Sequence, residues 1–205
     1  MGIGTKHLSK KSREQQIVIA ADTVLQQVGV NNFTIDQVVE TLDIAKGTVY
    51  KYYKSKDELL SMVSIKALRL LLDYFKLTVN GKEGGAESIK AMLMSCYQYA
   101  QSYPEYFELI VYMERPEFHS QMDAYASISA EITDFVKTHI SKEQQLGTIN
   151  KELKPLTVTY VLWGSCMGMM NFIESKRNFI KNVDDIDQRE LIATYAGLLA
   201  SGMEA

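Results

Sequence analysis

Hydrophobic residues recur every three or four positions along most of this chain, which is the spacing of one buried helix face. Residues 35–42 show it clearly, because Ile35, Val38, Val39 and Leu42 fall on a single side of a helix. No segment has the strict alternation of a half-buried strand. The pattern therefore predicts an all-α protein.

Glycine and proline residues divide this pattern into separate helices. The first helix starts near Ser12 and ends at Gly29, and its apolar stripe is Ile17, Ala20, Ala21, Val24, Leu25 and Val28. A later helix has a long apolar stripe at Ile89, Met92, Leu93, Cys96, Tyr97 and Ala100. The predicted helices cover about 12–28, 34–42, 45–53, 56–77, 86–101, from 104 onward, 119–141, 155–177 and from 187 onward.

Residues 34–53 are predicted to form two short helices joined by a tight turn. Thr34 caps the first helix and forms a capping box with Gln37, and Asp43 marks the turn. The second helix buries only Val49 and Tyr53. Its remaining residues face outward: Lys46, Gly47, Thr48, Tyr50, Lys51 and Tyr52. Many DNA-binding proteins use two helices in this arrangement to place the second helix against DNA.

The outward residues have the chemistry of a DNA-contacting surface. Lysine binds phosphates, the threonine hydroxyl and the tyrosine phenols form hydrogen bonds, and glycine lets the backbone approach a ligand closely. Ser55 and Glu58 form a second predicted capping box. Lys56 lies beside it, at a helix N-terminus that suits a phosphate.

The run GTVYKYYKSKDELL, at residues 47–60, has a small residue, Thr, an aliphatic residue, Tyr, two variable residues, an aromatic residue, and then Lys and a Leu pair. This order resembles the DNA-binding domain of TetR/AcrR-family transcriptional regulators, and the resemblance covers residues 11 to about 71. It implies operator contacts at Thr34, Lys46, Gly47, Thr48, Tyr50, Lys51, Tyr52 and Lys56. It also implies about nine helices in total.

Two positions depart from the family pattern. Ala45 stands where the family usually has a serine cap, so the second helix is expected to lack a side-chain cap, at a cost of about 1 kcal/mol. Asp36 stands where some members have a basic residue that contacts DNA, so no base contact is expected there.

Charge is divided unevenly along the chain. Residues 1–56 contain 8 Lys and Arg against 5 Asp and Glu, which leaves 14 against 20 in the remainder of a chain whose net charge is −3. Because the N-terminal part is basic and the rest of the chain is acidic, a polyanion is expected to bind to the N-terminal part. The leading segment with Lys6, Lys10, Lys11 and Arg13 is predicted to be a flexible arm, which either touches DNA or is simply solvated.

Several other classes of function find no support in the sequence. Cys96 and Cys166 lie in apolar helical surroundings, which is typical of buried thiols in a reduced, cytoplasmic protein rather than of a disulfide. His7, His119 and His139 have no metal-ligand spacing. No nucleophile–base order or phosphate-binding loop is present. We therefore expect no metal, no cofactor and no enzymatic activity.

Residues 156–173 contain no charged residue and are long enough to span a membrane. Thr157, Thr159, Ser165 and Asn171 dilute the hydrophobicity of this segment, and Pro155 opens it as it opens a soluble helix. We expect no membrane insertion.

Methionine and aromatic side chains are frequent in the helical part that follows residue 56. They either fill an irregular core or line an adaptable pocket. The family resemblance implies a ligand cavity enclosed by the fourth, fifth, seventh and eighth helices. The residues expected to face it are Met92, Cys96, Trp163 and Met167.

Gly164 and Gly168 lie on one face of the helix predicted at 155–177. Small residues let helices approach closely, either within one chain or between two chains. The resemblance implies that the last two helices of two subunits form a four-helix dimer interface. Leu191, Tyr195 and Leu198 supply the stripe that such an interface needs.

The sequence thus predicts two domains: an N-terminal arm with a helix-turn-helix domain at 1–55, and a helical effector-binding and dimerisation domain at 56–205. The function expected is that of a cytoplasmic, homodimeric transcriptional regulator, most often a repressor, that binds a palindromic DNA operator and is released by a small apolar or aromatic effector. The alternatives are a helical small-molecule or lipid-binding protein or enzyme with no operator, and an architectural DNA-binding protein with no ligand.

Overall fold

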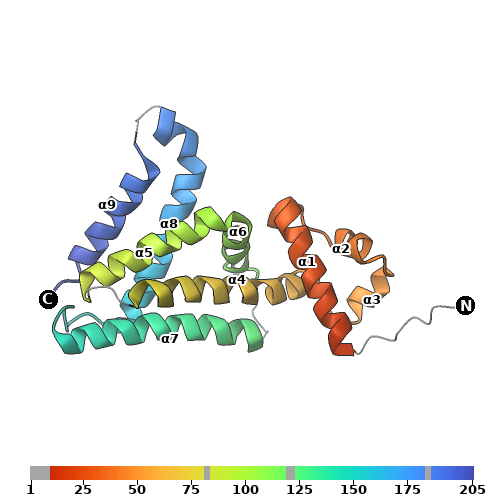
Figure 1. Ribbon diagram of the computed structural model, residues 1–205, viewed down its shortest axis with the longest axis horizontal. Coiled ribbons are helices and arrows are strands. Elements are labelled where there is room, and N and C mark those ends of the chain that lie inside the picture. Colours follow the sequence, from red (N-terminus) through yellow and green to blue (C-terminus); the bar gives the residue numbers. More distant parts are fainter. Residues whose placement is uncertain (1–9, 81–83, 119–122, 183–185) are drawn as a thin grey trace, which may run out of the picture. The chain divides into compact units, whose positions relative to one another are not determined.

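The structure is a computed structural model that describes residues 10–80, 84–118, 123–182 and 186–205. Within these ranges the only strand-like feature is one isolated bridge between Ile149 and Glu204. The helices, labelled in Figure 1, are α1 (Lys10–Asn32), α2 (Ile35–Leu42), α3 (Lys46–Tyr50), α4 (Lys56–Val79), α5 (Ala86–Ser102), α6 (Pro104–Met113), α7 (Asp123–Leu146), α8 (Pro155–Asn182) and α9 (Gln188–Ser201). The prediction of an all-α fold with nine helices is confirmed for the described residues.

Most predicted helix ends agree with the structure to within a few residues. The first helix begins at Lys10, so Lys10, Lys11 and Arg13 belong to α1 rather than to the predicted arm. Gly29 breaks α1 as predicted, with a φ of 70°, although helical geometry resumes up to Asn32. The predicted start of the seventh helix near residue 119, together with His119, lies outside the described residues. So do Lys6 and His7 of the arm.

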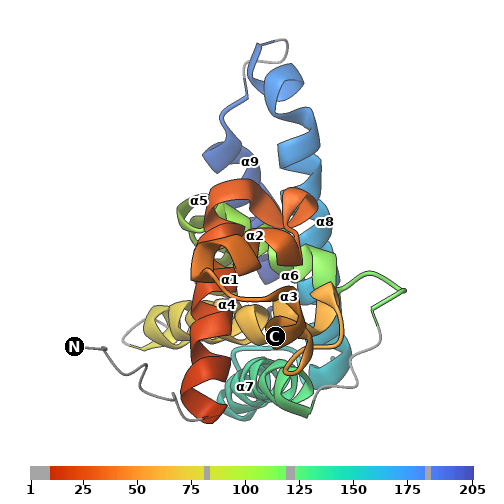
Figure 2. The same ribbon diagram turned by 90° about the vertical axis from the view of Figure 1, so that its right-hand side faces the viewer.

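The chain divides into two compact units, and neither is continuous in sequence. The first contains residues 1–67 and 105–126, and the second contains residues 68–104 and 127–205. Within the first unit α2 packs on α1 and α3 packs on α2, which both views show (Figures 1 and 2). The helix α4 is unbroken but contributes its first half to one unit and its second half to the other. The functional boundary after residue 55 stays a prediction.

Two carboxylates tie α6 into the first unit. Asp22 of α1 accepts hydrogen bonds from Lys66 Nζ at 2.6 Å and from Tyr106 Oη at 2.8 Å. Asp57, in the first turn of α4, accepts from Tyr112 Oη at 3.0 Å and forms an ion pair with Arg115, whose guanidinium stacks on the Tyr112 ring. The segment around α6 therefore belongs with the N-terminal helices, which no periodicity in the sequence indicated.

The second unit is built around α5, which packs against α8 and α9. The predicted stripe of α5 is buried from Ile89 to Tyr97, while Ala100 is half-buried. Both cysteine side chains are buried, as predicted. The structure also brings them together: a hydrogen bond with the Cys166 thiol, together with burial, raises the pKa of the Cys96 thiol well above its ordinary value. Protonated, buried thiols of this kind are chemically inert packing groups.

A buried carboxylate organises the start of α5. Glu143 of α7 is buried and accepts hydrogen bonds from the Gly85 N–H and from Thr148 Oγ1. A side chain at position 84 would lie 2.6 Å from this carboxylate and would displace it, and Gly85 has a φ of 68°, which favours glycine at that position. One helical turn away on α7, His139 Nε2 lies 2.7 Å from the Ser88 hydroxyl.

This cluster makes the fold sensitive to acid. Burial lowers the pKa of His139. For Glu143 burial opposes ionisation, but hydrogen bonds from Thr148 and Gly85 and the charge of His139 hold the pKa of the carboxyl below its ordinary value. Groups whose pKa is lower in the folded state stabilise the protein above the unfolded pKa, and this contribution is lost as the pH falls.

We therefore expect the free energy of unfolding to fall as the pH drops from about 7.5 to about 5.5, because His139 must then be protonated against its lowered pKa. Replacing His139 with Gln keeps a hydrogen-bonding group beside Ser88 but removes the titration. The variant should show a flatter profile over this range when stability is measured by urea unfolding. Equal slopes for both proteins would rule out His139 as the titrating group.

Candidate functional site

The N-terminus of α2, where the two-helix motif begins, is capped as the sequence predicted. Thr34 Oγ1 accepts a hydrogen bond from the Gln37 N–H at 3.3 Å, and Gln37 Oε1 accepts from the Thr34 N–H at 2.8 Å, so the capping box is confirmed. Asp43 ends α2 in the left-handed conformation, with a φ of 49°. Aspartate tolerates this conformation better than most residues, which allows a tight turn into α3.

The helix α3 is shorter than the sequence indicated. It covers five residues, Lys46–Tyr50, whereas the prediction covered 45–53. Beyond it the Tyr52 and Tyr53 N–H groups both donate to the Val49 carbonyl, at 2.9 and 3.0 Å, so the chain tightens into a turn. Ala45 makes no side-chain cap, as predicted, and Val49 and Tyr53 are both buried, also as predicted.

The outer side of α3 presents most of the predicted contact residues. Lys46, Gly47, Tyr50 and Lys51 are exposed, and so is Thr34 at the start of α2, while Thr48 and Tyr52 are half-buried. A methyl group placed on Gly47 would meet no described atom within 4 Å. The backbone at Gly47 is thus open to a ligand. Six of these seven residues lie on one short segment, residues 46–52, where a partner can contact several of them at once, and Thr34 lies at the start of α2.

The first lysine of α3 is engaged within the protein. Lys46 Nζ lies 2.7 Å from the Asp36 carboxylate of α2, and both side chains are more than half exposed. The hydrogen bond and the charge of Asp36 raise the pKa of Lys46. A partner that takes the Lys46 ammonium must therefore compete with an intramolecular carboxylate. Sequence reasoning treated Asp36 only as a missing contact and did not predict this pairing.

Lys56 differs more strongly from its predicted role. Its ammonium donates to the Val30 carbonyl at 3.0 Å and lies over the rings of Phe33 and Tyr112, at 5.8 and 5.5 Å from their centroids. Burial, and repulsion from Arg115, lower the pKa of Lys56. The side chain links segments of the first unit, and it would have to leave these contacts to bind a phosphate. Lys54, which sequence reasoning passed over, is exposed two residues earlier.

The capping box predicted at Ser55 forms with a shift. The Glu58 N–H donates to Ser55 Oγ at 3.1 Å, but the Glu58 carboxylate accepts from the Lys54 N–H. The start of α4 is therefore fixed at Lys56 as predicted, and only the partner of the Glu58 carboxylate differs, because it is the Lys54 N–H rather than the Ser55 N–H.

A cavity of about 550 Å³ opens between α4 and α5, in the second unit. Its lining residues are Tyr74, Leu77, Thr78, Glu87, Lys90, Ala91, Met94, Ser95 and Gln98. None of the four predicted pocket residues is among them: Met92 and Cys96 are buried on α5, and Trp163 and Met167 are half-buried on α8. The lining residues of α5 form a helical stripe of their own, at positions 87, 90, 91, 94, 95 and 98. In the sequence this stripe interleaves with the one that contains Met92 and Cys96. The assignment of Met92, Cys96, Trp163 and Met167 to a ligand pocket stays a prediction.

The predicted dimer residues occupy two kinds of environment. Gly164, Gly168 and Leu198 are exposed, whereas Leu191 and Tyr195 are half-buried. The Tyr195 hydroxyl lies 2.8 Å from Ser165 Oγ, which joins α9 to α8 within one chain. Large apolar side chains are exposed along α8: Leu156, Tyr160, Val161, Phe172 and Phe179.

This apolar exposure also explains why α8 resembles a membrane span. Residues Pro155–Lys176 pass a test of length and composition, and 28% of the window is buried. A single helix of this kind is weak support for a span, since helices of soluble proteins pass the same test. Among the described residues no group of three His, Cys, Asp or Glu side chains is placed to hold a metal ion.

Comparisons with known proteins agree with this geometry. Residues 17–63 match the sequence profile of bacterial regulatory proteins of the tetR family. A curated relative, an uncharacterized HTH-type transcriptional regulator of Haemophilus influenzae, is 23% identical over 96 residues, or 47% of this chain. The chain spans about half the length of that relative, 51%.

Solved structures share the fold over nearly the whole chain. The fatty acid degradation regulator FadR of Bacillus halodurans is 15% identical with a TM-score of 0.69, covering 94% of this chain and 97% of that one. FadR of Bacillus subtilis in complex with stearoyl-CoA is 16% identical with a TM-score of 0.66, covering 93% and 99%. These likenesses establish the architecture of an N-terminal helix-turn-helix domain followed by a helical domain. The N-terminal domain of the chain, over residues 17–63, belongs to the tetR family of bacterial regulatory proteins.

Proposed function

We propose that this protein is a transcriptional regulator that binds a DNA operator through α3, as a homodimer, and is controlled by a small amphipathic or apolar effector. The observation that carries the proposal is the outer side of α3. In a helix of five residues, only Val49 is buried, and cationic, phenolic and glycine positions are left facing outward. Such a surface has no role in packing, and its groups are those that contact phosphates and base edges.

The exposed residues divide into two roles. Lys51 carries an ammonium suited to a phosphate, and Lys46 can join it once the Asp36 pair opens. Thr48 and Tyr50 offer hydroxyl groups for orientation and base readout, and Gly47 allows close backbone approach. Thr34, with an exposed side chain at the N-terminus of α2, and Tyr52 complete the proposed contact set.

A dimer is proposed because α8 and α9 leave apolar side chains and two glycines exposed together. Tyr160, Gly164, Gly168 and Phe172 are spaced by four residues and all are exposed, with Leu198 of α9 also 72% exposed. A second copy of the same face would bury this stripe. A twofold dimer then matches a palindromic operator with half-sites about 34 to 36 Å apart, or a multiple of that distance.

The effector response is proposed to pass through α4. The first half of this unbroken helix belongs to the first unit, where it buries Leu59, Leu60 and Val63. Its second half belongs to the other unit, where it buries Leu71, Leu72 and Phe75. An effector bound in the second unit that favours one position of α4 therefore changes the free energy of operator binding. A coupling of about 1 to 3 kcal/mol weakens DNA binding roughly 5- to 150-fold. Cytoplasmic location and repression are part of this proposal.

Selection of bound sequences from a random DNA duplex library tests the proposal directly. Recovery of a palindrome that the protein binds with strong salt dependence would support it. A lipid carrier or enzyme on the same fold would enrich no sequence, and an architectural protein would enrich only weak preferences.

Lys51 and Lys56 should behave differently when each is replaced with Ala. Lys51→Ala should reduce the slope of log affinity against log salt by about 0.9, because one phosphate contact is lost. Lys56→Ala should leave the slope unchanged but lower the free energy of unfolding by roughly 1 kcal/mol. The reason is that the Lys56 ammonium donates a hydrogen bond to the Val30 carbonyl and lies over the rings of Phe33 and Tyr112. Fluorescence anisotropy across a salt series and urea unfolding measure the two effects. A reduced slope in Lys56→Ala would restore this residue to the DNA interface.

Replacing Asp36 with Asn should tighten DNA binding about two- to tenfold for any sequence, because Lys46 loses its intramolecular partner and a negative charge leaves the interface. Asp134→Asn is the matched control, since Asp134 pairs with Lys137 at 2.6 Å on an exposed face of α7. The same charge is removed there, so affinity should not change. Equal effects of the two substitutions would mean that net charge alone is responsible.

Replacing Gly168 with Leu should disrupt the dimer and thereby weaken operator binding. Within one chain a side chain at Gly168 meets no described atom within 4 Å, so the added bulk is harmful only if a partner packs there. Ala130→Leu, on an exposed position of α7, adds comparable bulk elsewhere and serves as the control. Sedimentation velocity should give a monomer for the first variant and a dimer for the second. An intact Gly168→Leu dimer would place the interface on another face.

A further inference from the structure

We propose that the groove between α4 and α5 binds an elongated, amphipathic monocarboxylate that carries a hydrogen-bond donor at the end opposite its carboxylate. This inference rests on the proposed function only in that such a ligand would be the effector. The groove differs in every lining residue from the pocket that the sequence predicted.

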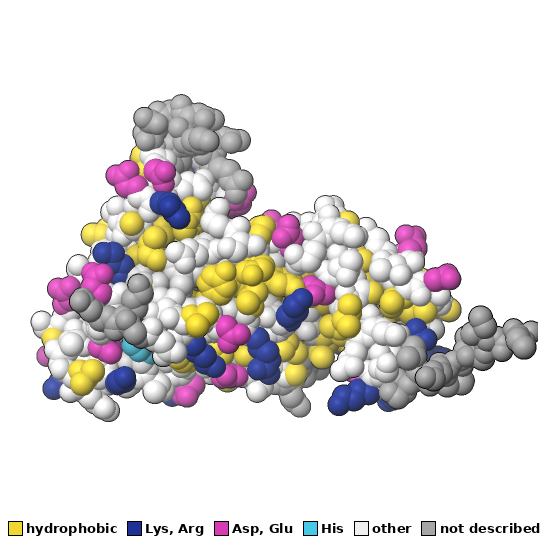
Figure 3. Space-filling view, viewed as in Figure 1, with side chains coloured by type: hydrophobic (Ala, Val, Ile, Leu, Met, Phe, Trp, Pro, Cys, Tyr) yellow, Lys and Arg dark blue, Asp and Glu magenta, His cyan; other side chains and the backbone are white. Residues whose placement is uncertain are grey.

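The groove has the volume of a small-molecule site and combines apolar with polar lining residues. A volume of about 550 Å³ falls within the usual range of about 300 to 1,000 Å³ for ligand pockets. All of its lining residues belong to the second unit, six on α5 and three on α4. Hydrophobic side chains are exposed along the strip between these two helices (Figure 3). Leu77, Ala91 and Met94 provide apolar contact for the body of a ligand.

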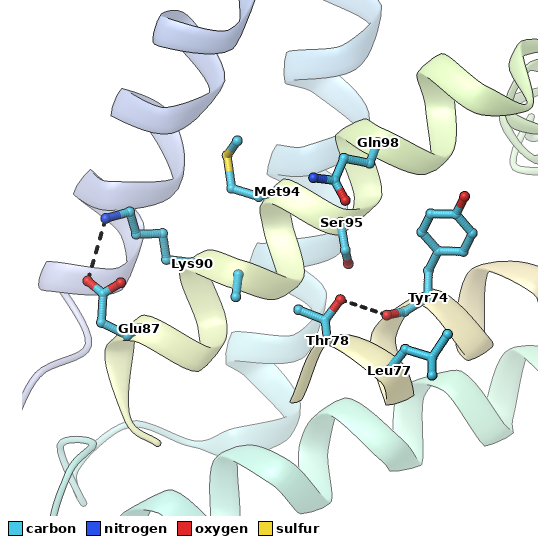
Figure 4. A pocket seen from close by; sticks show the side chains of 9 residues that line it. Tyr74, Leu77, Thr78, Glu87, Lys90, Met94, Ser95 and Gln98 are labelled. Carbon is cyan, nitrogen blue, oxygen red and sulfur yellow. Dashed lines mark hydrogen bonds and ion pairs between the residues drawn. The ribbon is translucent and has the colours of Figure 1, made fainter. Parts of the chain in front are cut away.

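The groove is elongated because it follows α5. Lys90 lies towards one end and Gln98 towards the other, as Figure 4 shows. Eight residues of helix separate them, which corresponds to about 12 Å at a rise of about 1.5 Å per residue. A ligand that contacts both ends must therefore be long and narrow.

One end of the groove is suited to a carboxylate. Lys90 Nζ forms an ion pair with Glu87, at 3.5 Å and three residues away on the same helix, and both side chains are substantially exposed. Exposed pairs of this kind contribute little to stability. A ligand carboxylate can therefore take the ammonium, with Glu87 as the group that opposes it.

Two hydroxyl oxygens in the groove can accept a hydrogen bond from the ligand. The Ser95 hydroxyl donates its proton to the Met92 carbonyl at 2.8 Å, and the Thr78 hydroxyl donates to the Tyr74 carbonyl at 2.7 Å. With their protons directed to these carbonyls, both oxygens present lone pairs that accept from a ligand. Ser95 is 2% exposed, and its side chain and that of Thr78 point toward one another from the two helices (Figure 4). The Gln98 amide, beyond them, both donates and accepts.

These three features together select the ligand class. Lys90 requires an anion, the apolar wall requires a hydrocarbon body, and the accepting oxygens require a hydroxyl or amine. A straight-chain ω-hydroxy acid of medium length satisfies all three. Plain fatty acids lack the donor, and fatty alcohols lack the anion.

Isothermal titration calorimetry with the full-length protein, without DNA, tests the proposal. The probes are ω-hydroxydecanoate, decanoate and decanol. We expect ω-hydroxydecanoate to bind at least about threefold more tightly than either of the others, because each of them loses one directed polar contact. Equal affinities for all three compounds would overturn the assignment of ligand class.

Substitutions locate the binding. Lys90→Met should weaken ω-hydroxydecanoate binding about tenfold, the loss expected for one charge-assisted hydrogen bond, and should leave decanol unaffected. Glu87→Gln should strengthen binding of the acid. Lys137→Met is the matched control, because Lys137 forms the same kind of exposed pair on α7 and does not line the groove. Equal effects of Lys90→Met and Lys137→Met would overturn the site.

Filling the groove provides an independent measurement. Ala91→Trp should abolish binding, and Met94→Trp gives a second variant if the first is not folded by circular dichroism. Undiminished binding in a folded groove-filled variant would overturn the site. Operator binding without ligand separates this inference from the proposed function: a protein that selects a palindrome but binds none of the three probes keeps its function and loses this groove as the effector site.

Discussion

A helix of five residues cannot hold its own shape in water, so α3 depends on what anchors it. Val49 and Tyr53 are the anchors, at 0% and 3% exposure. Forming one helical turn fixes several residues for a single hydrogen bond, and burial of these two side chains has to offset that cost. Because both anchors lie on one side, the other residues of the segment are left exposed or half-buried. The segment can therefore present a contact surface, because only the side chains of Val49 and Tyr53 are fully used in packing.

Local ion pairs then decide which cations are available to a partner. Lys46 is held by Asp36 and Lys56 by the Val30 carbonyl and two aromatic rings, whereas Lys51 and Lys54 are exposed. The basic character of residues 1–56 therefore overstates the positive charge that a polyanion would meet on this segment. The pairing of Lys46 also means that binding of a phosphate there exchanges one ion pair for another, which lowers the net gain in affinity.

Carboxylates have a similar organising role elsewhere. Asp22 and Asp57 hold α6 against α1 and the start of α4, and Glu143 fixes the glycine turn before α5. Each accepts at least one hydrogen bond from a distant segment of its unit. Such contacts link residues that are far apart in sequence, and this is why the first compact unit includes residues 105–126.

The sequence by itself determined the helices and the outward side of α3. Apolar spacing, the Thr34 capping box and the Gly29 break depend on neighbours within about four residues, so they could be predicted before any tertiary contact was known. Tertiary structure decided the rest. It shortened α3, turned Lys56 inward and paired Cys96 with Cys166. It also placed the described cavity on the stripe of Glu87, Lys90, Met94 and Gln98 rather than on that of Met92 and Cys96. The physical reason is that both stripes of α5 have helical periodicity, and only packing against α8 and α9 determines which one is buried.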